Sequence, residues 1–285
     1  MKIGIVGLGL IGGSLGLDLQ SQGHEVMGVS RRPATCQQAI DRGVVHRASP
    51  HLDSLTAAEI VFLCTPLDHL IPVAQELIPH LSSHTILTDV GSAKAAIVQT
   101  LEPLWPNFIG GHPMAGKAES GLAVAQLGLF QGNPYVLTPT CHTPPEAITV
   151  VTRLVQSLQA DLYTCSAEAH DRSVAWISHL PVMVSASLIA ACDREMDPTV
   201  KTLAQQLASS GFRDTSRVGG GSPDLGVLMA RYNRAALLAG LAQYQETIAQ
   251  VQRWIEQENW EALMAFLEQT QAQRPPYLVK TGPGA

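Results

Sequence analysis

The chain opens on Lys2-Ile-Gly-Ile-Val6 and runs directly into Gly7-Leu-Gly9-Leu-Ile-Gly12. The first stretch is short, apolar and rich in isoleucine and valine, which is typical of a buried parallel strand. The second has glycines at the spacing G-x-G-x-x-G, and the leucines that follow indicate a helix. Between a strand and a helix, this fingerprint binds a dinucleotide, with the pyrophosphate at the positive helix N-terminus. The alternative is an ordinary glycine-bearing loop, and we favour the dinucleotide-binding unit.

The end of the second apolar strand, residues 24–29, indicates which dinucleotide is bound. An enzyme selective for NAD usually carries Asp or Glu at this place to hold the ribose 2′-hydroxyl. Here the strand is followed by Ser30-Arg31-Arg32, a hydroxyl and two guanidinium groups without an acid. Arginine pairs with phosphate through a planar fork of donors, so this tip predicts NADP as the cofactor. The alternative is a pair of solvated surface arginines.

Length, composition and charge exclude several classes of protein. The 285 residues, 46% of them hydrophobic, suffice for one large domain or two ordinary ones and are too apolar for a disordered chain. The net charge of −6 argues against nucleic acid as the main partner. A strand stands where a signal peptide would, and the five cysteines form no C-x-x-C pair, which predicts reduced thiols and a cytoplasmic protein. The ten histidines lack ligand spacing, so no metal site is expected.

Strands and helices alternate through the first half of the chain. Further apolar strands are predicted at 60–64, 85–88, 108–109, 135–138 and 162–163, with helices between them. This alternation predicts a doubly wound, mostly parallel sheet of the Rossmann type over residues 1–165. Ligands bind at the carboxyl ends of the strands of such sheets. The predicted cofactor-binding residues are Gly7, Gly9, Leu10, Ile11, Gly12, Ser30, Arg31, Arg32, Cys64, Thr65 and Pro66.

The second half of the chain, residues 166–280, shows only helical periodicity. Helices are predicted over 167–192, 198–210, 223–255 and 259–273, with breaks at Gly211 and Gly219–Gly221. The stretch Val174–Ala191 carries no Asp, Glu, Lys or Arg. It is barely long enough to cross a membrane and contains polar residues, so we expect a soluble helix buried inside the domain or between subunits. This half is predicted to be an all-helical substrate and dimerisation domain of a homodimer.

A histidine between a diglycine and a proline is the second strong signal. It is His112, in Gly110-Gly111-His112-Pro113, and we expect it on a stiff loop that no helix or strand buries. A dehydrogenase needs a base for the hydroxyl proton that is lost as hydride leaves, and histidine suits this exchange near neutral pH. Ser92, on the loop after the preceding strand, is expected to hydrogen-bond the imidazole and fix its tautomer. The alternatives are a loop-fixing His112 and a Ser92 that caps a helix.

The helical half offers two further candidates. His179 lies inside the uncharged helix, where a satisfied core histidine and a ligand-binding one are equally plausible interpretations. Arg217 precedes the break at Gly219–Gly221, and an arginine exposed there can hold a carboxylate at two points. The alternative for Arg217 is a surface salt bridge.

Six blocks of the sequence, taken in order, carry a family resemblance: the Gly7–Gly12 fingerprint, Asp89-Val-Gly-Ser92, Gly111-His112-Pro113-Met114-Ala-Gly116, His170-Asp171, Ser178-His179-Leu-Pro181 and Gly211-Phe-Arg-Asp-Thr-Ser-Arg217. Together they resemble the prephenate/arogenate dehydrogenases of tyrosine biosynthesis over nearly the whole chain. The resemblance implies a nucleotide-binding domain followed by a helical dimerisation domain. It also implies that His112 accepts the proton of the ring 4-hydroxyl, that Ser92 orients it, and that Arg217 binds the ring carboxylate. His179 falls on a family histidine, for which substrate binding and a structural role both stay open.

Two features of the sequence indicate which substrate of the family is used. Prephenate-using members of the family often have a second histidine in the pattern S-H-x-P-H, where this chain has Val182. The tip at Ser30-Arg31-Arg32 resembles that of the NADP-using, arogenate-preferring members from cyanobacteria and plants. We therefore expect a monofunctional arogenate dehydrogenase that converts L-arogenate to L-tyrosine by NADP-dependent oxidative decarboxylation.

Three other functions are alternatives to this one. The nearest is prephenate dehydrogenase, which would give 4-hydroxyphenylpyruvate. A β-hydroxyacid dehydrogenase of similar architecture would use a lysine in the first helix of the helical domain, and this chain has none there. A binding module that senses NADP(H) would have no need for His112, Ser92 and Arg217 to converge.

Overall fold

The first half of the chain folds around one twisted sheet, as a computed structural model that describes residues 1–117 and 119–278 shows. The strand order is β3-β2-β1-β4-β5-β6-β7-β8. The strands are β1 Lys2–Val6, β2 Glu25–Val29, β3 Arg47–Ser49, β4 Ile60–Leu63, β5 Ile86–Asp89, β6 Phe108–Pro113, β7 Pro134–Thr138 and β8 Asp161–Thr164. Neighbours from β3 to β6 are parallel, whereas β7 is antiparallel to β6 and parallel to β8. The predicted doubly wound, mostly parallel sheet is confirmed.

The central strand β1 marks the point where the direction of winding reverses. The chain goes from β1 outward to β2 and β3, and then returns to β4 on the other side of β1. Such a reversal opens a crevice at the carboxyl ends of the two strands, because the loops that follow them turn away in opposite directions. The glycine fingerprint after β1 and the segment after β4 therefore meet at this crevice.

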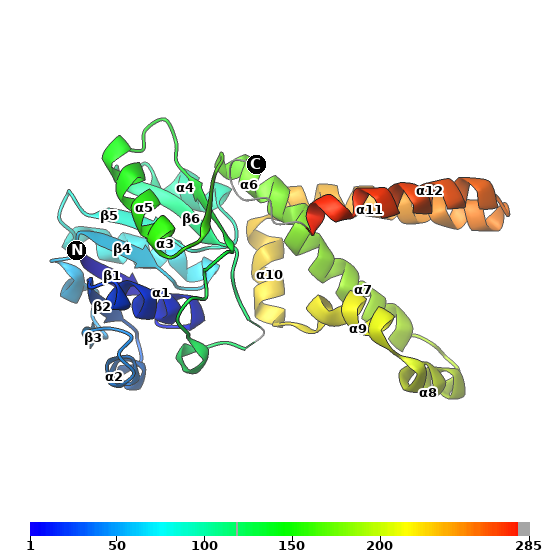
Figure 1. Cartoon of the computed structure of the whole chain (residues 1–285), viewed down its shortest axis with the longest axis horizontal. Coiled ribbons are helices and arrows are strands. Elements are labelled where there is room, and N and C mark those ends of the chain that lie inside the picture. The colour runs from blue at the N-terminus through cyan, green and yellow to red at the C-terminus, as the bar shows by residue number, and fades with distance from the viewer. Residues whose placement is uncertain (118, 279–285) are drawn as a thin grey trace.

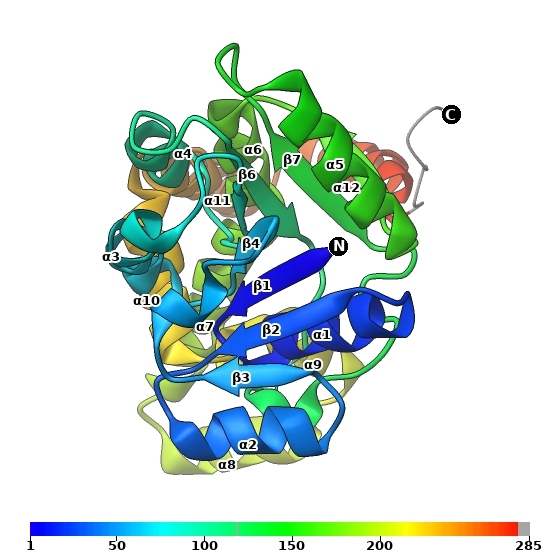
Figure 2. The ribbon, with the colours of Figure 1, turned by 90° about the vertical axis from the view of Figure 1, so that its left-hand side faces the viewer.

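Helices cover both faces of the sheet (Figure 2). They are α1 Leu10–Ser21, α2 Pro33–Asp41, α3 Leu67–Leu77, α4 Ala95–Leu101 and α5 Pro145–Ser157, with 3-10 turns at Leu52–Leu55, Ile78–His80 and Leu122–Val124. The apolar residues of α1 and α5 pack in one core cluster, and those of α3 and α4 pack in a second. Strands that are buried from both sides have no polar face, which explains the continuous apolar runs of β1 and β4.

The prediction that His112 lies on a loop is wrong. Strand β6 extends to Pro113, and His112 pairs with Val136 of the antiparallel strand β7 and is buried. The two glycines before it serve close packing in the sheet. A Cβ on Gly110 would lie 2.4 Å from the hydroxyl of Thr138, and one on Gly111 would lie 2.7 Å from the carbonyl of Asp89. Glycine has a low strand propensity, so the sequence pattern did not indicate that β6 continues through Gly110 and Gly111.

The second half is helical, as predicted. Its elements are α6 Ala167–Val174, a π-helical turn Ala175–His179, α7 Leu180–Asp193, α8 Pro198–Leu207, α9 Ser210–Ser216, a 3-10 turn Arg217–Gly220, α10 Pro223–Tyr232, α11 Arg234–Glu256, α12 Trp260–Gln273 and a 3-10 turn Pro275–Tyr277. Two predicted details are wrong. Gly211 lies inside α9, and the helix expected over 223–255 is interrupted at Asn233, which separates α10 from α11.

The π-helical turn has an identifiable cause. Pro181 has no N–H to donate to the carbonyl four residues earlier, and its ring would collide with that carbonyl in a regular helix. The turn widens instead, and the N–H of Leu180 bonds the carbonyl of Ala175, five residues earlier. His179, at the end of this turn, is fully buried.

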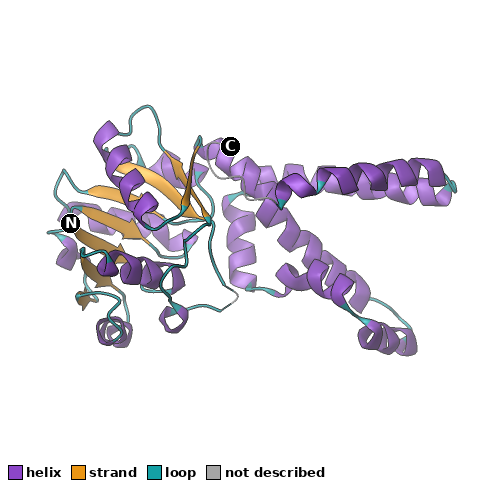
Figure 3. Ribbon diagram, in the orientation of Figure 1, coloured by secondary structure: helices purple, strands orange, loops and turns teal. Residues whose placement is uncertain are grey.

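The helical half projects from the sheet domain as two arms (Figure 1). One arm is the pair α11 and α12, and the other is formed by α7, α8 and α9, with α10 beside the sheet domain (Figure 3). The segment Ala167–Asp193 is long and apolar enough to cross a membrane by length and composition, and 28% of its most apolar window is buried within the chain. The last predicted domain boundary, residue 280, lies outside the described residues.

Candidate active site

The glycine fingerprint has the geometry that a bound pyrophosphate needs. Gly7 has φ +101°, a left-handed conformation that favours glycine, and a Cβ there would lie 2.6 Å from the carbonyl oxygen of Cys64. A Cβ on Gly12 would lie 2.0 Å from the carbonyl oxygen of Gly7, so α1 can approach the strand only without a side chain. A Cβ on Gly9 would meet nothing within 4 Å. Packing therefore explains Gly7 and Gly12, and the open space at Gly9, directly before α1, fits a phosphate on the backbone.

The other predicted cofactor residues surround this loop. Leu10 and Ile11 form the half-buried first turn of α1 and pack on the core. Cys64 and Thr65 follow β4, next to Gly7, and the hydroxyl of Thr65 is buried without a hydrogen-bond partner. An unpaired buried hydroxyl beside the loop is consistent with a ligand that supplies its partner. Pro66 is exposed at the start of α3.

The tip of β2 presents two free cationic side chains. Arg31 and Arg32 are exposed, and within residues 1–117 and 119–278 no hydrogen bond or ion pair involves either guanidinium group. The hydroxyl of Ser30 accepts a hydrogen bond from the backbone N–H of Arg32 at 3.4 Å, which curves the tip. Both guanidinium groups are thus available to an anionic ligand.

His112 lies at the carboxyl end of β6, in contact with the helical half. Its Nδ1 lies 2.8 Å from Nε2 of His170 on α6, and the two rings meet edge to face at an interplanar angle of 72°. Burial, with the nearby His170 and Lys94, lowers the pKa of His112 well below its usual value. The imidazole is therefore neutral near pH 7 and able to accept a proton.

His170 is held in turn by Asp171. Nδ1 of His170 lies 2.8 Å from Oδ1 of Asp171, and both side chains are buried. The carboxylate also accepts hydrogen bonds from the backbone N–H groups of Lys94 at 2.7 Å and Ala95 at 2.9 Å, at the first turn of α4. Asp171 thereby ties α6 of the helical half to α4 of the sheet domain.

A buried ion pair lies beneath this cluster. Lys94 and Asp89 are both fully buried and pair directly. Lys94 also donates to the carbonyl of Gly111 at 2.7 Å, and Asp89 accepts from the backbone N–H groups of Gly91 at 2.8 Å and Gly111 at 3.2 Å. Both groups of the pair therefore fix the backbone of the residue before His112.

Ser92 does not form the expected hydrogen bond to the imidazole of His112. It is half-buried, and no hydrogen bond of its hydroxyl occurs in the described part of the chain. Nδ1 of His112 is occupied by His170 instead. Ser92 is not the N-cap of α4 either, since that position is Lys94. A contact between Ser92 and the substrate side of the imidazole stays a prediction.

His179 has one free, buried nitrogen. Its Nδ1 accepts from the amide of Asn233 at 3.1 Å, and the same amide group donates to the carbonyl of Asp171 at 2.7 Å. Because Nδ1 is an acceptor, Nε2 carries the proton of the neutral ring, and Nε2 is buried without a partner. Burial lowers the pKa of His179 to about 4. A lone donor in this position fits an acceptor oxygen of a ligand.

Arg217 is not joined to this cluster within one chain. It begins the 3-10 turn after α9 and is exposed, and its side chain takes part in none of the hydrogen bonds and ion pairs of the described residues. This turn packs on α7, and a Cβ on Gly219 would lie 2.4 Å from the backbone of Ala186. Its guanidinium group is free for a carboxylate, as the sequence predicts for a binding residue.

Four residues around His112 and His179 received no role from the sequence. His170 and Asp171 stood out only as a motif, and their adjacency at the start of a helix was the available signal. Lys94 had no signal, because a fully buried lysine is rare and its partner Asp89 is recognised only from the folded sheet. Asn233 likewise meets His179 only through tertiary contact.

Comparison with known proteins places the whole chain in one family. Residues 15–164 match "Prephenate dehydrogenase, nucleotide-binding domain", and residues 166–269 match "Prephenate dehydrogenase, dimerization domain". A prephenate dehydrogenase of Bacillus subtilis is 31% identical over 93% of this chain and 72% of its own length. A cyclohexadienyl dehydrogenase of Zymomonas mobilis is 30% identical over 78% of this chain and 76% of its own length.

Similar solved structures support the same family assignment. The crystal structure of Synechocystis arogenate dehydrogenase is 50% identical, with a TM-score of 0.89 over 97% of this chain and 100% of that one. Prephenate dehydrogenase from Aquifex aeolicus, in complex with hydroxyphenyl propionate and NAD+, is 26% identical, with a TM-score of 0.90 over 96% of this chain and 97% of that one. The fingerprint geometry, the buried histidine and both matched domains thus lead to one conclusion: the chain belongs to the prephenate dehydrogenase family and is a nicotinamide-dependent dehydrogenase of the prephenate/arogenate type.

Proposed function

We propose that the chain is an arogenate dehydrogenase that converts L-arogenate and NADP+ into L-tyrosine, CO2 and NADPH. The observation that carries this proposal is the neutral, buried His112 at the carboxyl edge of the sheet that bears the glycine fingerprint. The proposal is supported by the 50% identity to Synechocystis arogenate dehydrogenase. Val182 supports it as well, because the position lacks the second histidine that prephenate-using relatives often carry.

The reaction assigns each group one task. A nicotinamide dinucleotide whose pyrophosphate is held at Gly7, Gly9 and Gly12 would supply the hydride acceptor. His112 accepts the proton of the ring 4-hydroxyl at Nε2, because its Nδ1 is engaged with His170. His179 donates from Nε2 to a substrate oxygen, and Arg217 binds the ring carboxylate that leaves as CO2. Aromatisation of the ring then makes the step effectively irreversible.

The alternative substrate is prephenate, which relatives from Bacillus subtilis and Aquifex aeolicus carry in their names. A steady-state assay with both substrates and both cofactors decides between them. The proposal requires that kcat/KM for arogenate exceed that for prephenate. A preference for prephenate would replace the substrate while leaving the reaction type intact, and turnover of neither substrate would remove the assignment.

NADP+ is expected to be strongly preferred, because Arg31 and Arg32 are exposed at the tip of β2 and their guanidinium groups have no partner among the described residues. The triple variant S30D/R31A/R32A should raise KM for NADP+ by more than about tenfold, the value of one lost charge-assisted hydrogen bond, and should change KM for NAD+ far less. R47A is a matched control, since Arg47 is also exposed but pairs with Glu25. Equal use of both cofactors by the unmodified protein would contradict the assignment.

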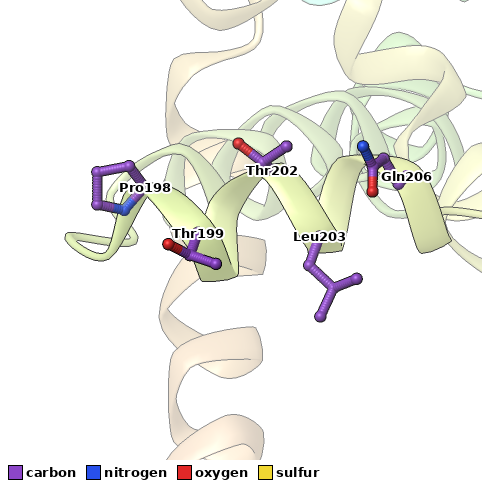
Figure 4. A pocket seen from close by; sticks show the side chains of 5 residues that line it. All are labelled: Pro198, Thr199, Thr202, Leu203 and Gln206. Atoms are coloured by element: carbon purple, nitrogen blue, oxygen red, sulfur yellow. The ribbon is translucent and has the colours of Figure 1, made fainter.

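A homodimer formed through the helical half is part of the proposal. None of the residues of α8 is buried, and its Leu203 and Leu207 are 51% and 70% exposed. The shallow hollow on this helix is lined by Pro198, Thr199, Thr202, Leu203 and Gln206 (Figure 4), and α8 lies well away from β6, the strand that carries His112 (Figure 1). The apolar face of a helix is buried against another surface in a stable protein. Only 28% of the most apolar window of Ala167–Asp193 is buried within one chain, which supports cover by a second subunit.

Sedimentation at micromolar concentration is expected to give the mass of a dimer, because an obligate interface of this kind is large and hydrophobic. The variant L203D/L207D should shift the protein towards the monomer. L127D is the control, because Leu127 is 60% exposed on the sheet domain. A monomer of unmodified protein would contradict the proposed dimer.

The remaining assignments complete the proposal. The domains are residues 1–165 and 166–280, which agrees with the end of β8 at Thr164 and the start of α6 at Ala167. The protein acts in the cytoplasm on a small molecule, and its five cysteines are free thiols. Nucleic acid and membrane are not among its partners.

A further inference from the structure

We infer that His170 and Asp171 are positioning residues that fix the tautomer of His112 and share the proton it gains. This inference rests on the proposed role of His112 as the base. The pair reaches His112 from α6, across the boundary between the sheet domain and the helical half.

The chain of hydrogen bonds begins at a carboxylate that can only accept. Asp171 accepts from the backbone N–H group of Lys94 at Oδ1, at 2.7 Å, and from that of Ala95 at Oδ2, at 2.9 Å, so both of its oxygens are acceptors. Its Oδ1 also lies 2.8 Å from Nδ1 of His170. An ionised carboxylate has no proton to donate, so the proton between the two groups sits on Nδ1 of His170.

The position of the proton on His170 determines which nitrogen of His112 carries its proton. With Nδ1 protonated, a neutral His170 has its lone pair on Nε2, and Nε2 lies 2.8 Å from Nδ1 of His112. Nδ1 of His112 must therefore donate, and the lone pair of a neutral His112 lies on Nε2. This is the tautomer that a general base requires, and it presents the one nitrogen that the pair does not use.

The pair also stabilises the charge that the reaction creates. When the substrate O–H bond breaks and Nε2–H forms on His112, the imidazolium charge has Lys94, His170 and His179 around it, all of which oppose it. Moving the Nδ1 proton onto Nε2 of His170 carries the charge towards Asp171, the carboxylate in direct contact with His170. The other titratable groups near His112 are Asp89, paired with Lys94, and Tyr135 of β7.

Three variants test the pair. D171N keeps an oxygen at the position of Oδ1, which accepts from both Lys94 and His170, but it removes the negative charge that stabilises the shared proton. We expect kcat to fall by roughly 10²–10⁴-fold with KM nearly unchanged. H170F removes the acceptor for His112 and should lower kcat by about 10²-fold. H170Q places an amide oxygen near the former Nε2 and should restore kcat to within about tenfold of the unmodified enzyme.

The direct readout is the tautomer, measured by two-bond 15N–1H correlation of 15N-histidine-labelled protein. The unmodified protein should show Nε2 of His112 unprotonated, and H170F, which removes the acceptor of the Nδ1 proton, should show Nε2 protonated to a larger extent. H142F is the matched control, because His142 is exposed in the turn after β7, at the opposite edge of the sheet, and should leave kcat and the His112 signals unchanged.

The possible outcomes separate this inference from the proposed function. If H112N is inactive while H170F and D171N both retain kcat within about twofold, the pair is only structural and the inference fails while the base remains. If H112N keeps normal kcat, the base assignment and this inference fall together. If D171N does not fold, the comparison of H170F with H170Q and the tautomer of the unmodified protein still decide.

Discussion

His112→Asn is expected to lower kcat by roughly 10²–10⁴-fold, the usual range for the loss of a positioned base, with little change in KM. Asparagine places an amide N–H near the former Nδ1 and so keeps the hydrogen bond to His170. It has nothing at the position of Nε2. The contact that is lost strengthens only as the O–H bond breaks, so ground-state binding is preserved.

The pH dependence provides a second measurement on the same residue. Activity requires unprotonated His112, and burial holds its pKa well below the usual value of histidine. As the pH falls, kcat/KM for the unmodified enzyme should therefore stay level through the ordinary histidine range and decline only at lower pH. H112N should lack this acidic decline.

R217A provides the contrasting variant. A carboxylate ligand binds substrate and transition state alike until CO2 departs, so R217A should raise KM by far more than it lowers kcat. A near-normal kcat with a raised KM in H112N would instead make the histidine a binding residue.

Lys94→Met is expected to destabilise the protein by about 3–5 kcal/mol, the usual cost of removing one partner of a buried pair. Lys94 and Asp89 are both fully buried, so the substitution leaves a carboxylate without its counter-ion in the core. The carbonyl of Gly111 loses its donor as well. Urea unfolding followed by circular dichroism measures the change as a shift of the midpoint.

Two further variants separate the buried charge from the loss of a side chain. K201M is the matched control, because the pair Lys201–Asp193 is solvent-accessible, with side chains 34% and 73% exposed, and should contribute less than about 1 kcal/mol. The double variant K94M/D89N removes both charges and should be more stable than K94M alone. A double variant less stable than K94M would show that the pair acts through hydrogen bonding to the backbone of β6 and not through charge.

The amino-acid sequence by itself determined the local parts of this molecule. The apolar run before Gly7 predicts β1, and the glycine spacing predicts the turn into α1, because both depend on residues that are neighbours in the chain. The change from alternating strands to helical periodicity near Cys165 marks the second half for the same reason. Arg31 and Arg32 are exposed at the tip of β2, directly after the strand that the sequence predicts.

Only the tertiary structure decided the environment of His112. Its place within β6 depends on pairing with β7, a strand that lies more than twenty residues later in the chain. Its partner His170 lies 58 positions away, in the helical half. The ion pair of Lys94 and Asp89 and the free nitrogen of His179 likewise depend on what surrounds each group after folding. Residue types and spacing name the chemical groups, whereas burial and long-range hydrogen bonds set their charge and their protons.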